Sequence, residues 1–301
     1  MVGTLAHLRP EMHDLVALPG AERLARLPGN RWIGYTRANQ VLALLERMLA
    51  SEPGRIRPHN LLIVGPSNNG KTMIAERFLR DHPPHASDND DREIIPVLAV
   101  QMPASPTLIR FHAAILAALN SPVSAQGRTL QLESMSLRLL TGVGCRMLVI
   151  DELHNLLAAP AQRQREMLNL LRFLGNELRI PLVCLGTRDA YLALRTDDQL
   201  ENRFQPFVLP LWEDGPEFAR LLASFEAVLP LREPSGLGAP ELRRLVAHRA
   251  EGIIGEVAAL LTAATSTALL AGAERIGPEA IEAADYQSPS VRRRLFEREL
   301  R

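Results

Sequence analysis

Residues 61–79 read LLIVGPSNNGKTMIAERFL, and this stretch decides the fold of the chain. An apolar run leads into Gly65, small and polar residues follow, and a second glycine precedes Lys71. Lys71 is the only lysine in the sequence, because every other Lys or Arg position is an arginine. An apolar run, a glycine-rich turn and an amphipathic segment predict a buried strand, a tight loop and a helix.

The loop matches the spacing G-x-x-x-x-G-K-[ST] at every position. Its members are Gly65, Pro66, Ser67, Asn68, Asn69, Gly70, Lys71 and Thr72. In this motif backbone N–H groups hold phosphates at the start of a helix. Lys71 is expected to reach the β- and γ-phosphates and Thr72 to ligate Mg²⁺. A compact ammonium fits such a nest better than a broad guanidinium, which accounts for a lysine in an arginine-rich chain. The sequence therefore predicts ATP and Mg²⁺ as ligands.

A second motif, RMLVIDELH, occupies residues 146–154. Asp151 follows an apolar run and is expected to hold Mg²⁺ through water, while Glu152 polarises the attacking water as general base. The second acid favours hydrolysis over phosphoryl transfer to a small acceptor. Two interpretations of His154 stay open: contact with the γ-phosphate or a nucleic acid, and a solvated helix-cap residue.

Composition sets the class of protein. The chain has 301 residues, 47% of them apolar and 23% charged, with a formal net charge of zero. These values indicate a globular protein of one or two domains and give no global signal for nucleic-acid binding. Cys145 and Cys184 adjoin apolar runs and are expected to be buried thiols. The segment 253–273 contains Glu256 and predicts a packed helix, and no signal peptide is evident, so a cytoplasmic location is expected.

Apolar strands alternate with helical segments, a pattern that predicts a five-stranded parallel sheet covered by helices. The expected strands lie within 60–65, 94–102, 145–153, 180–187 and 204–211, and 83–93 is expected to be a polar loop. The α/β class is followed by a region that is helical throughout. We predict an N-terminal arm (1–30), an α/β nucleotide-binding domain (31–213), a helical lid (214–286) and a C-terminal tail (287–301).

The motifs GPSNNGKT, LVIDELH, LVCLGT and ENRF occur in this order before the helical region. Together they resemble an AAA+ P-loop ATPase. More narrowly, RWIGYTRANQVLALLERML, the paired asparagines and the run DELHN resemble the TniB family of transposition ATPases, relatives of TnsC. The resemblance extends roughly from Arg31 to Ala284.

The resemblance implies further site residues. The segment from Trp32 to Tyr35 would lie near the adenine, with Tyr35 as a nucleotide contact, and Thr187 would act as a sensor at the tip of a strand. Arg203 would serve a neighbouring subunit as an arginine finger, and Arg195 is the competing candidate. The chain departs from the AAA+ pattern at Gly255 and Glu256, where many lids carry a sensor arginine, and this departure predicts slow or partner-dependent hydrolysis.

The resemblance also implies partners: a homo-oligomeric ring or filament on duplex DNA, a TniA-like transposase and a TniQ-like target-selection adaptor. Arg110, Arg163 and Arg165 are candidate phosphate contacts, with a solvated surface as the alternative. The terminal SPSVRRRLFERELR, residues 288–301, is either a partner-docking segment or a solvated end.

Other functions are compatible with the motifs. A helicase loader or replication initiator would share the fold, but an initiator usually adds a DNA-reading module and only 287–301 follow the expected lid. A secretion ATPase would need a membrane span. A nucleotide-gated scaffold with little turnover differs from an ATPase only in its hydrolysis rate.

Overall fold

The computed structural model describes residues 5–27, 32–51, 58–88, 91–121 and 128–300. Parts of the predicted N-terminal arm (1–4 and 28–30), of the predicted polar loop 83–93 (89–90) and of the predicted tail (301) lie outside the described residues. The chain divides into two compact units. The sheet unit comprises 40–67 and 71–210, and the helical unit comprises 1–39, 68–70 and 211–301.

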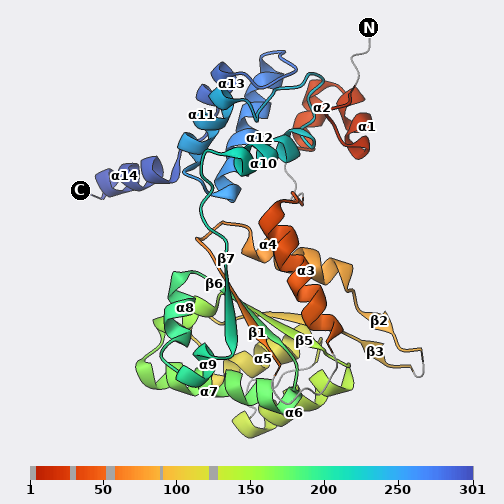
Figure 1. The fold of residues 1–301 in the computed structure, drawn as a ribbon, viewed down its shortest axis with the longest axis vertical. Helices are drawn as coiled ribbons and strands as arrows, with labels where there is room; N and C mark the ends of the chain where they lie inside the picture. Colours follow the sequence, from red (N-terminus) through yellow and green to blue (C-terminus); the bar gives the residue numbers. More distant parts are fainter. Residues whose placement is uncertain (1–4, 28–31, 52–57, 89–90, 122–127, 301) are drawn as a thin grey trace. The chain divides into compact units, whose positions relative to one another are not determined.

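The sheet unit (Figure 1) is built on five parallel strands, which follow one another in the order β4-β5-β6-β1-β7. Their bounds are β1 Asn60–Val64, β4 Val97–Gln101, β5 Met147–Asp151, β6 Leu182–Gly186 and β7 Phe204–Val208. The predicted α/β class and five-stranded parallel sheet are therefore confirmed. In the register of the sheet, Val64 pairs with Gly186 and Gln101 with Asp151. The loops that follow β1, β5 and β6 consequently emerge at one edge, where ligands of parallel sheets bind.

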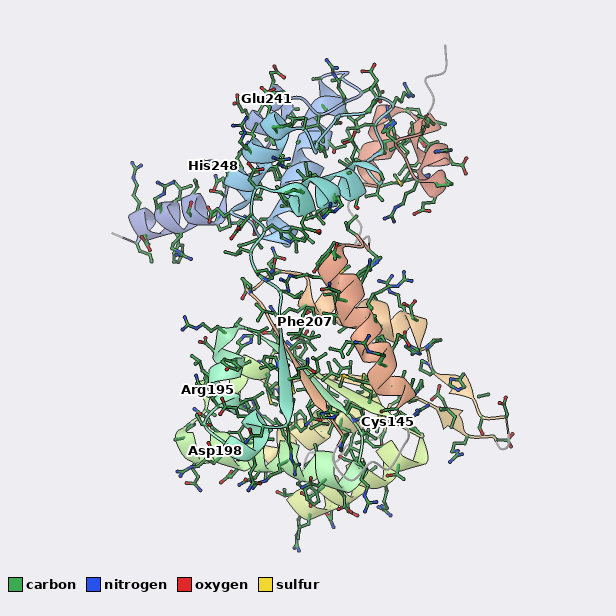
Figure 2. The ribbon with its side chains drawn as sticks, in the orientation of Figure 1. Cys145, Arg195, Asp198, Phe207, Glu241 and His248 are labelled. Carbon is green, nitrogen blue, oxygen red and sulfur yellow. The ribbon has the colours of Figure 1, made fainter. Side chains whose placement is uncertain are left out.

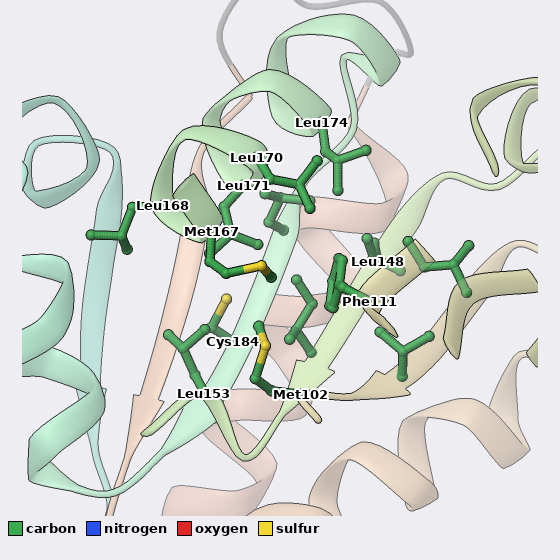
Figure 3. Close-up of a cluster of buried hydrophobic side chains, with 14 of the residues drawn as sticks. Met102, Phe111, Leu148, Leu153, Met167, Leu168, Leu170, Leu171, Leu174 and Cys184 are labelled. Carbon is green, nitrogen blue, oxygen red and sulfur yellow. The ribbon is translucent and has the colours of Figure 1, made fainter. Parts of the chain in front are cut away.

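Helices pack on this sheet and exclude water from it. They are α3 Thr36–Ala50 (which starts in the helical unit), α4 Lys71–Asp81, α5 Leu108–Ala118, α6 Thr129–Gly142, the 3-10 helix η2 Leu153–Ala158, α7 Ala161–Leu178, α8 Arg188–Leu194 and α9 Asp198–Glu201. Figure 3 shows Met167, Leu170, Leu171 and Leu174 of α7 in one cluster with strand residues, and all four are buried. The i, i+3, i+4 spacing of these residues produces the apolar face.

Cys184 lies in this cluster and Cys145, labelled in Figure 2, is also buried, so both thiols are free and enclosed as predicted. Burial raises the pKa of Cys145 to about 11, which keeps the thiol protonated and unreactive. The polar segment 83–93 is not only a loop, because β2 His85–Ala86 and β3 Glu93–Ile94 form a short antiparallel pair. The prediction missed this pair because two-residue strands leave no periodicity in the sequence.

The helical unit contains helices from both ends of the chain. They are the 3-10 helix η1 Pro10–Met12, α1 His13–Ala17, α2 Gly20–Ala25, α10 Pro216–Glu226, α11 Pro240–Ala250, α12 Ile254–Leu270, α13 Pro278–Glu282 and α14 Pro289–Glu299. Arg23 of α2 is 2% exposed and donates to both carboxylate oxygens of Glu274 at 2.7 Å. This enclosed ion pair attaches the N-terminal helices to the rest of the unit.

Among the described residues no single helix is long and apolar enough to cross a membrane. Helices α11 and α12 satisfy the length and composition test only together, as a pair bent by 116°. The predicted packed helix at 253–273 corresponds to α12, and eight of its side chains, Glu256 among them, are buried in the helical unit.

Candidate nucleotide-binding site

The glycine-rich loop connects β1 to α4 at the ligand-binding edge of the sheet. Residues Leu61 to Ile63 are at most 1% exposed, and α4 begins at Lys71. The N–H of Gly65 donates to the Gly186 carbonyl at 3.1 Å and ties the loop to β6. Gly70 has φ +83°, a conformation that side-chain-bearing residues rarely adopt. The strand, loop and helix that the motif requires are all present.

Lys71 lies inside the loop rather than in solvent. Its Nζ donates to the carbonyls of Gly65 at 2.9 Å and Pro66 at 2.7 Å, and the residue is 6% exposed. Burial lowers the pKa of Lys71, while the carboxylates of Asp151 and Glu152 act in the opposite direction. A desolvated ammonium held by loop carbonyls is a strong binding group for a phosphate.

Thr72 and Asp151 come together across the edge of the sheet. The Thr72 hydroxyl donates to Asp151 Oδ2 at 2.6 Å, and Asp151 Oδ1 accepts the N–H of Glu152 at 2.7 Å. Hydroxyl and carboxylate oxygens are the hard ligands that Mg²⁺ prefers, with water completing its shell. These two side chains fit a magnesium ion bound together with phosphate oxygens.

Glu152 follows Asp151 with φ +57°, an unusual backbone conformation for a residue other than glycine. Its Oε2 lies 3.1 Å from His154 Nε2, and the other ring nitrogen of His154 is buried without a partner among the described residues. The strained backbone and the histidine together fix the direction of the carboxylate. His154 is therefore only partly solvated and contacts a residue of the candidate site. The sequence alone had left both interpretations of this histidine open.

Thr187 follows β6 and occupies the N-cap position of α8, where its side chain makes no capping hydrogen bond. Its hydroxyl is buried and has no hydrogen-bond partner within the described part of the chain. Buried hydroxyls are normally paired, so an orphaned one beside a phosphate loop suits a ligand atom.

The two candidate finger arginines lie elsewhere in the sheet unit. Arg203 precedes β7, donates to Asn176 Oδ1 at 2.7 Å and lines a hollow of about 430 Å³ with Pro58 and His59. Arg195, labelled in Figure 2, ends α8 as an exposed residue and donates to Glu201 at 3.0 Å. Arg203 is the less exposed of the two and is held at the edge strand, so its direction is better defined.

The candidate DNA-contacting arginines are all exposed. Arg110 lies in the first turn of α5, where its N–H donates to the capping Thr107 hydroxyl at 3.2 Å. Arg163 and Arg165 lie in the first turns of α7. Helices α5 and α7 pack against each other, so the three arginines occupy neighbouring elements.

The centre of the loop, 68–70, belongs to the helical unit, where it meets the start of α12. The Asn68 carbonyl accepts the Gly255 N–H at 3.0 Å, and Asn69 Oδ1 accepts the Ile254 N–H at 3.4 Å. In the sequence, Asn68 and Asn69 only indicated the family. In the structure they accept hydrogen bonds from the first two backbone N–H groups of α12, which have no partner within the helix.

Tyr35 also lies beside this part of the loop, because a Cβ at Gly70 would be 3.5 Å from its hydroxyl oxygen. The Tyr35 ring meets Trp212 edge-on at 5.2 Å between centroids, and burial raises the pKa of Tyr35 to about 12. The ring is therefore a rigid apolar wall with its hydroxyl protonated.

The contacts of Glu256 could not be predicted from the sequence. This residue occupies the place where a sensor arginine was sought, and its carboxylate binds Asn68 Nδ2 at 3.3 Å and Arg292 Nη2 at 2.7 Å. An acidic residue in an otherwise apolar helix was the available signal, but its partner Arg292 is distant in sequence.

The parallel sheet with its phosphate loop and two following acids, together with a C-terminal helical region, defines an AAA+ P-loop ATPase fold. Among the solved structures that share this fold with the chain are the three that follow. The Aeropyrum pernix ORC2 protein (ADPNP-ADP complexes) is 16% identical, with 86% of this chain and 70% of that chain covered and a TM-score of 0.61. Cdc6p from Pyrobaculum aerophilum is 17% identical, with 85% and 68% covered and a TM-score of 0.59. The Aeropyrum pernix ORC1 protein in complex with DNA is 18% identical, with 96% and 68% covered and a TM-score of 0.52.

A family model described as bacterial TniB protein matches residues 23–214, so this chain belongs to the TniB family. Among curated proteins no match is found. The predicted family resemblance is confirmed, and the solved structures, at their low identity, support the fold alone.

Proposed function

We propose that this protein is an ATP- and Mg²⁺-dependent regulator of DNA transposition that assembles on duplex DNA and recruits the transposase. One observation supports nucleotide binding: three side chains meet at one edge of the sheet. They are the enclosed ammonium of Lys71, the hydroxyl of Thr72 and the carboxylate of Asp151, and the last two are hydrogen-bonded at 2.6 Å. Membership of the TniB family supports the transposition part.

Each group in the site has a proposed task. Lys71 and the loop N–H groups bind the β- and γ-phosphates, and Thr72 with Asp151 holds the magnesium ion. When bound, Mg²⁺ supplies positive charge that neutralises the phosphate oxygens. Glu152 accepts a proton from the attacking water, and His154 directs its carboxylate toward that task.

Three further residues complete the proposed site. The buried Thr187 hydroxyl donates to the γ-phosphate or to the attacking water, and the Tyr35 wall borders the nucleotide base. Arg203 reaches the nucleotide of a neighbouring subunit, where its guanidinium stabilises the charge of the transferred phosphoryl group. Arg195 is the alternative finger, and it is the more exposed of the two arginines.

The proposed partners follow from surface charge and family membership. The exposed Arg110, Arg163 and Arg165 contact DNA phosphates, and each neutralised phosphate makes the affinity more salt-dependent. A homo-oligomer, as a ring or filament, brings copies of these arginines along the duplex. The helix α14 presents Leu295 and Phe296, which are 40% and 61% exposed, to a TniA-like transposase or a TniQ-like adaptor. This function belongs in the cytoplasm, where the DNA is.

The test is nucleotide binding and turnover with and without duplex DNA. Lys71→Ala is expected to weaken binding of Mg-ATP roughly 10- to 100-fold or more, because the main cation of the loop is lost. Arg77→Ala on the same helix is the control, because the Arg77 side chain is 41% exposed and forms an ion pair with Asp81 in the next turn. Equal affinity of Lys71→Ala and the wild-type protein for Mg-ATP would show that the nucleotide does not bind at this loop.

A nucleotide-gated scaffold is the second candidate, favoured by Glu256 in place of a sensor arginine. A turnover that stays at background with saturating DNA, while ATP still drives assembly, would establish it. A helicase loader or initiator shares the Orc-like fold, and helicase capture in place of transposase capture would favour it.

A further inference from the structure

The carboxylate of Glu256 is an enclosed charge in the first turn of α12. The residue is 7% exposed, and the helix around it is apolar. A buried carboxylate is costly unless hydrogen bonds and an opposite charge accompany it. The hydrogen-bond partners of Glu256 therefore indicate its role.

Three side chains from separate segments donate to Glu256. Arg292 Nη2 of α14 lies 2.7 Å from Oε1, the Tyr286 hydroxyl lies 2.8 Å from Oε2, and Asn68 Nδ2 of the phosphate loop lies 3.3 Å from Oε1. Burial opposes ionisation of Glu256, but the hydrogen bonds from Arg292 and Tyr286 outweigh it and lower the pKa of this carboxyl. Glu256 is thus an anion that joins the C-terminal helix to the loop.

The backbone of α12 holds the same loop residue from another side. A Cβ at Gly255 would lie 2.1 Å from Asn68 Oδ1, so only glycine leaves room for this side chain. The Gly255 N–H donates to the Asn68 carbonyl, and Asn68 itself has φ +59°. The left-handed conformation of Asn68 is set by these contacts, and it directs the following N–H groups that the motif uses for phosphate.

The charge of Glu256 has the wrong sign for a neighbour of a polyphosphate site. Alone, it would repel a bound nucleotide, because like charges in a weakly screened environment oppose each other. The guanidinium of Arg292 cancels that charge. Arg292 is half exposed, and α14 buries none of its own side chains, so the pair with Glu256 and the Ser290 N–H bond to Glu251 at 2.9 Å attach this helix to the unit.

We propose that Glu256 and Arg292 are positioning residues for the phosphate loop, through which the C-terminal helix α14 sets the affinity for nucleotide. Glu256 fixes Asn68, and Arg292 removes the repulsion that Glu256 would otherwise exert on the phosphates. Displacement of α14 separates the pair and weakens nucleotide binding. This inference rests on the proposed nucleotide-binding function of the loop.

The experiment compares four full-length proteins in titrations with Mg²⁺ and a non-hydrolysable ATP analogue: wild type, Arg292→Ala, Arg292→Ala with Glu256→Gln, and Arg294→Ala. Arg292→Ala is expected to weaken binding roughly tenfold, near the lower end of usual couplings between sites. The double variant is expected to return to within about threefold of wild type, because glutamine carries no charge but still accepts from Asn68. Arg294→Ala, an exposed arginine on the same helix, should bind as wild type.

Two results would overturn the inference: Arg292→Ala binding as tightly as wild type, or a double variant that binds as weakly as Arg292→Ala. The second result would assign the loss to packing of α14 instead of to charge. Tyr286→Phe supplies an independent variant, expected to weaken binding by roughly two- to fivefold because Glu256 loses one donor. If the wild-type protein binds no analogue, the proposed function fails, which is a distinguishable outcome.

Discussion

Gly255→Ala tests whether Asn68 occupies its place against α12. In most helices alanine is more stable than glycine by about 1 kcal/mol, so local propensity predicts a gain in the free energy of unfolding. Here the new Cβ would lie 2.1 Å from Asn68 Oδ1 and 2.5 Å from Nδ2, so the side chain must move away. The direction of the effect is therefore expected to reverse.

The magnitude follows from the contact that is lost. A hydrogen bond to a charged group contributes about 1.5–3 kcal/mol, and at 3.3 Å the bond from Asn68 Nδ2 to Glu256 belongs at the lower end. Subtracting the propensity gain of about 1 kcal/mol from a lost bond of about 1.5 kcal/mol leaves a net loss of about 0.5 kcal/mol. Because Asn68 no longer directs the loop, affinity for Mg-ATP is expected to fall roughly tenfold or more.

Urea unfolding and nucleotide titration on the same preparations measure both effects. Gly142→Ala is the matched control, since Gly142 is also helical and a Cβ there meets no atom within 4 Å. That variant should gain stability or stay unchanged, with normal nucleotide affinity. A Gly255→Ala protein that gains stability as the control does and binds nucleotide normally would refute the placement of Asn68.

Four other perturbations address separate parts of the molecule. Glu152→Gln should retain ATP binding but lose about 100-fold or more in turnover, because an amide accepts no proton; unchanged steady-state hydrolysis would reassign the base. Arg203→Ala should bind ATP yet lose turnover and ATP-dependent assembly, and mixing it with Lys71→Ala protein should restore activity at mixed interfaces; restoration that never occurs despite intact assembly would argue for a finger elsewhere. Replacing Phe296 by Ala should weaken transposase capture in pull-downs while nucleotide affinity stays at the wild-type value, and undiminished capture would place docking outside α14. Burial lowers the pKa of His112 from 6.5 to about 4, so the unfolded chain binds more protons between these values. The contribution of neutral His112 to the free energy of unfolding is then fully present above pH 6.5 and falls as pH drops toward 4, by at most about 3 kcal/mol. His112→Gln should make the urea midpoint less dependent on pH over that range. An unchanged pH dependence would contradict the assignment of this effect to His112.

Local sequence determined much of the sheet and of the site. The apolar runs before Gly65 and Asp151 are buried strands because continuous apolar residues fit a sheet covered on both faces. The spacing from Gly65 to Thr72 predicted a loop between strand and helix, since glycine with positive φ is needed where Gly70 lies. Such features depend on neighbouring residues alone, so they are visible without a structure.

Tertiary structure decided which distant groups meet. The strand order places β1 between β6 and β7, and in this order Thr72 meets Asp151 and Gly65 is tied to Gly186. The sequence presented Glu256 as a departure from an expected arginine and Arg292 as one of several tail arginines. A sequence shows that a side chain is charged but not whether it is solvated or paired. Pairing depends on contacts between segments that lie far apart along the chain. The fold pairs the buried charges of Arg23 and Glu256 with Glu274 and Arg292, and desolvation makes these pairings and their fixed hydrogen bonds necessary.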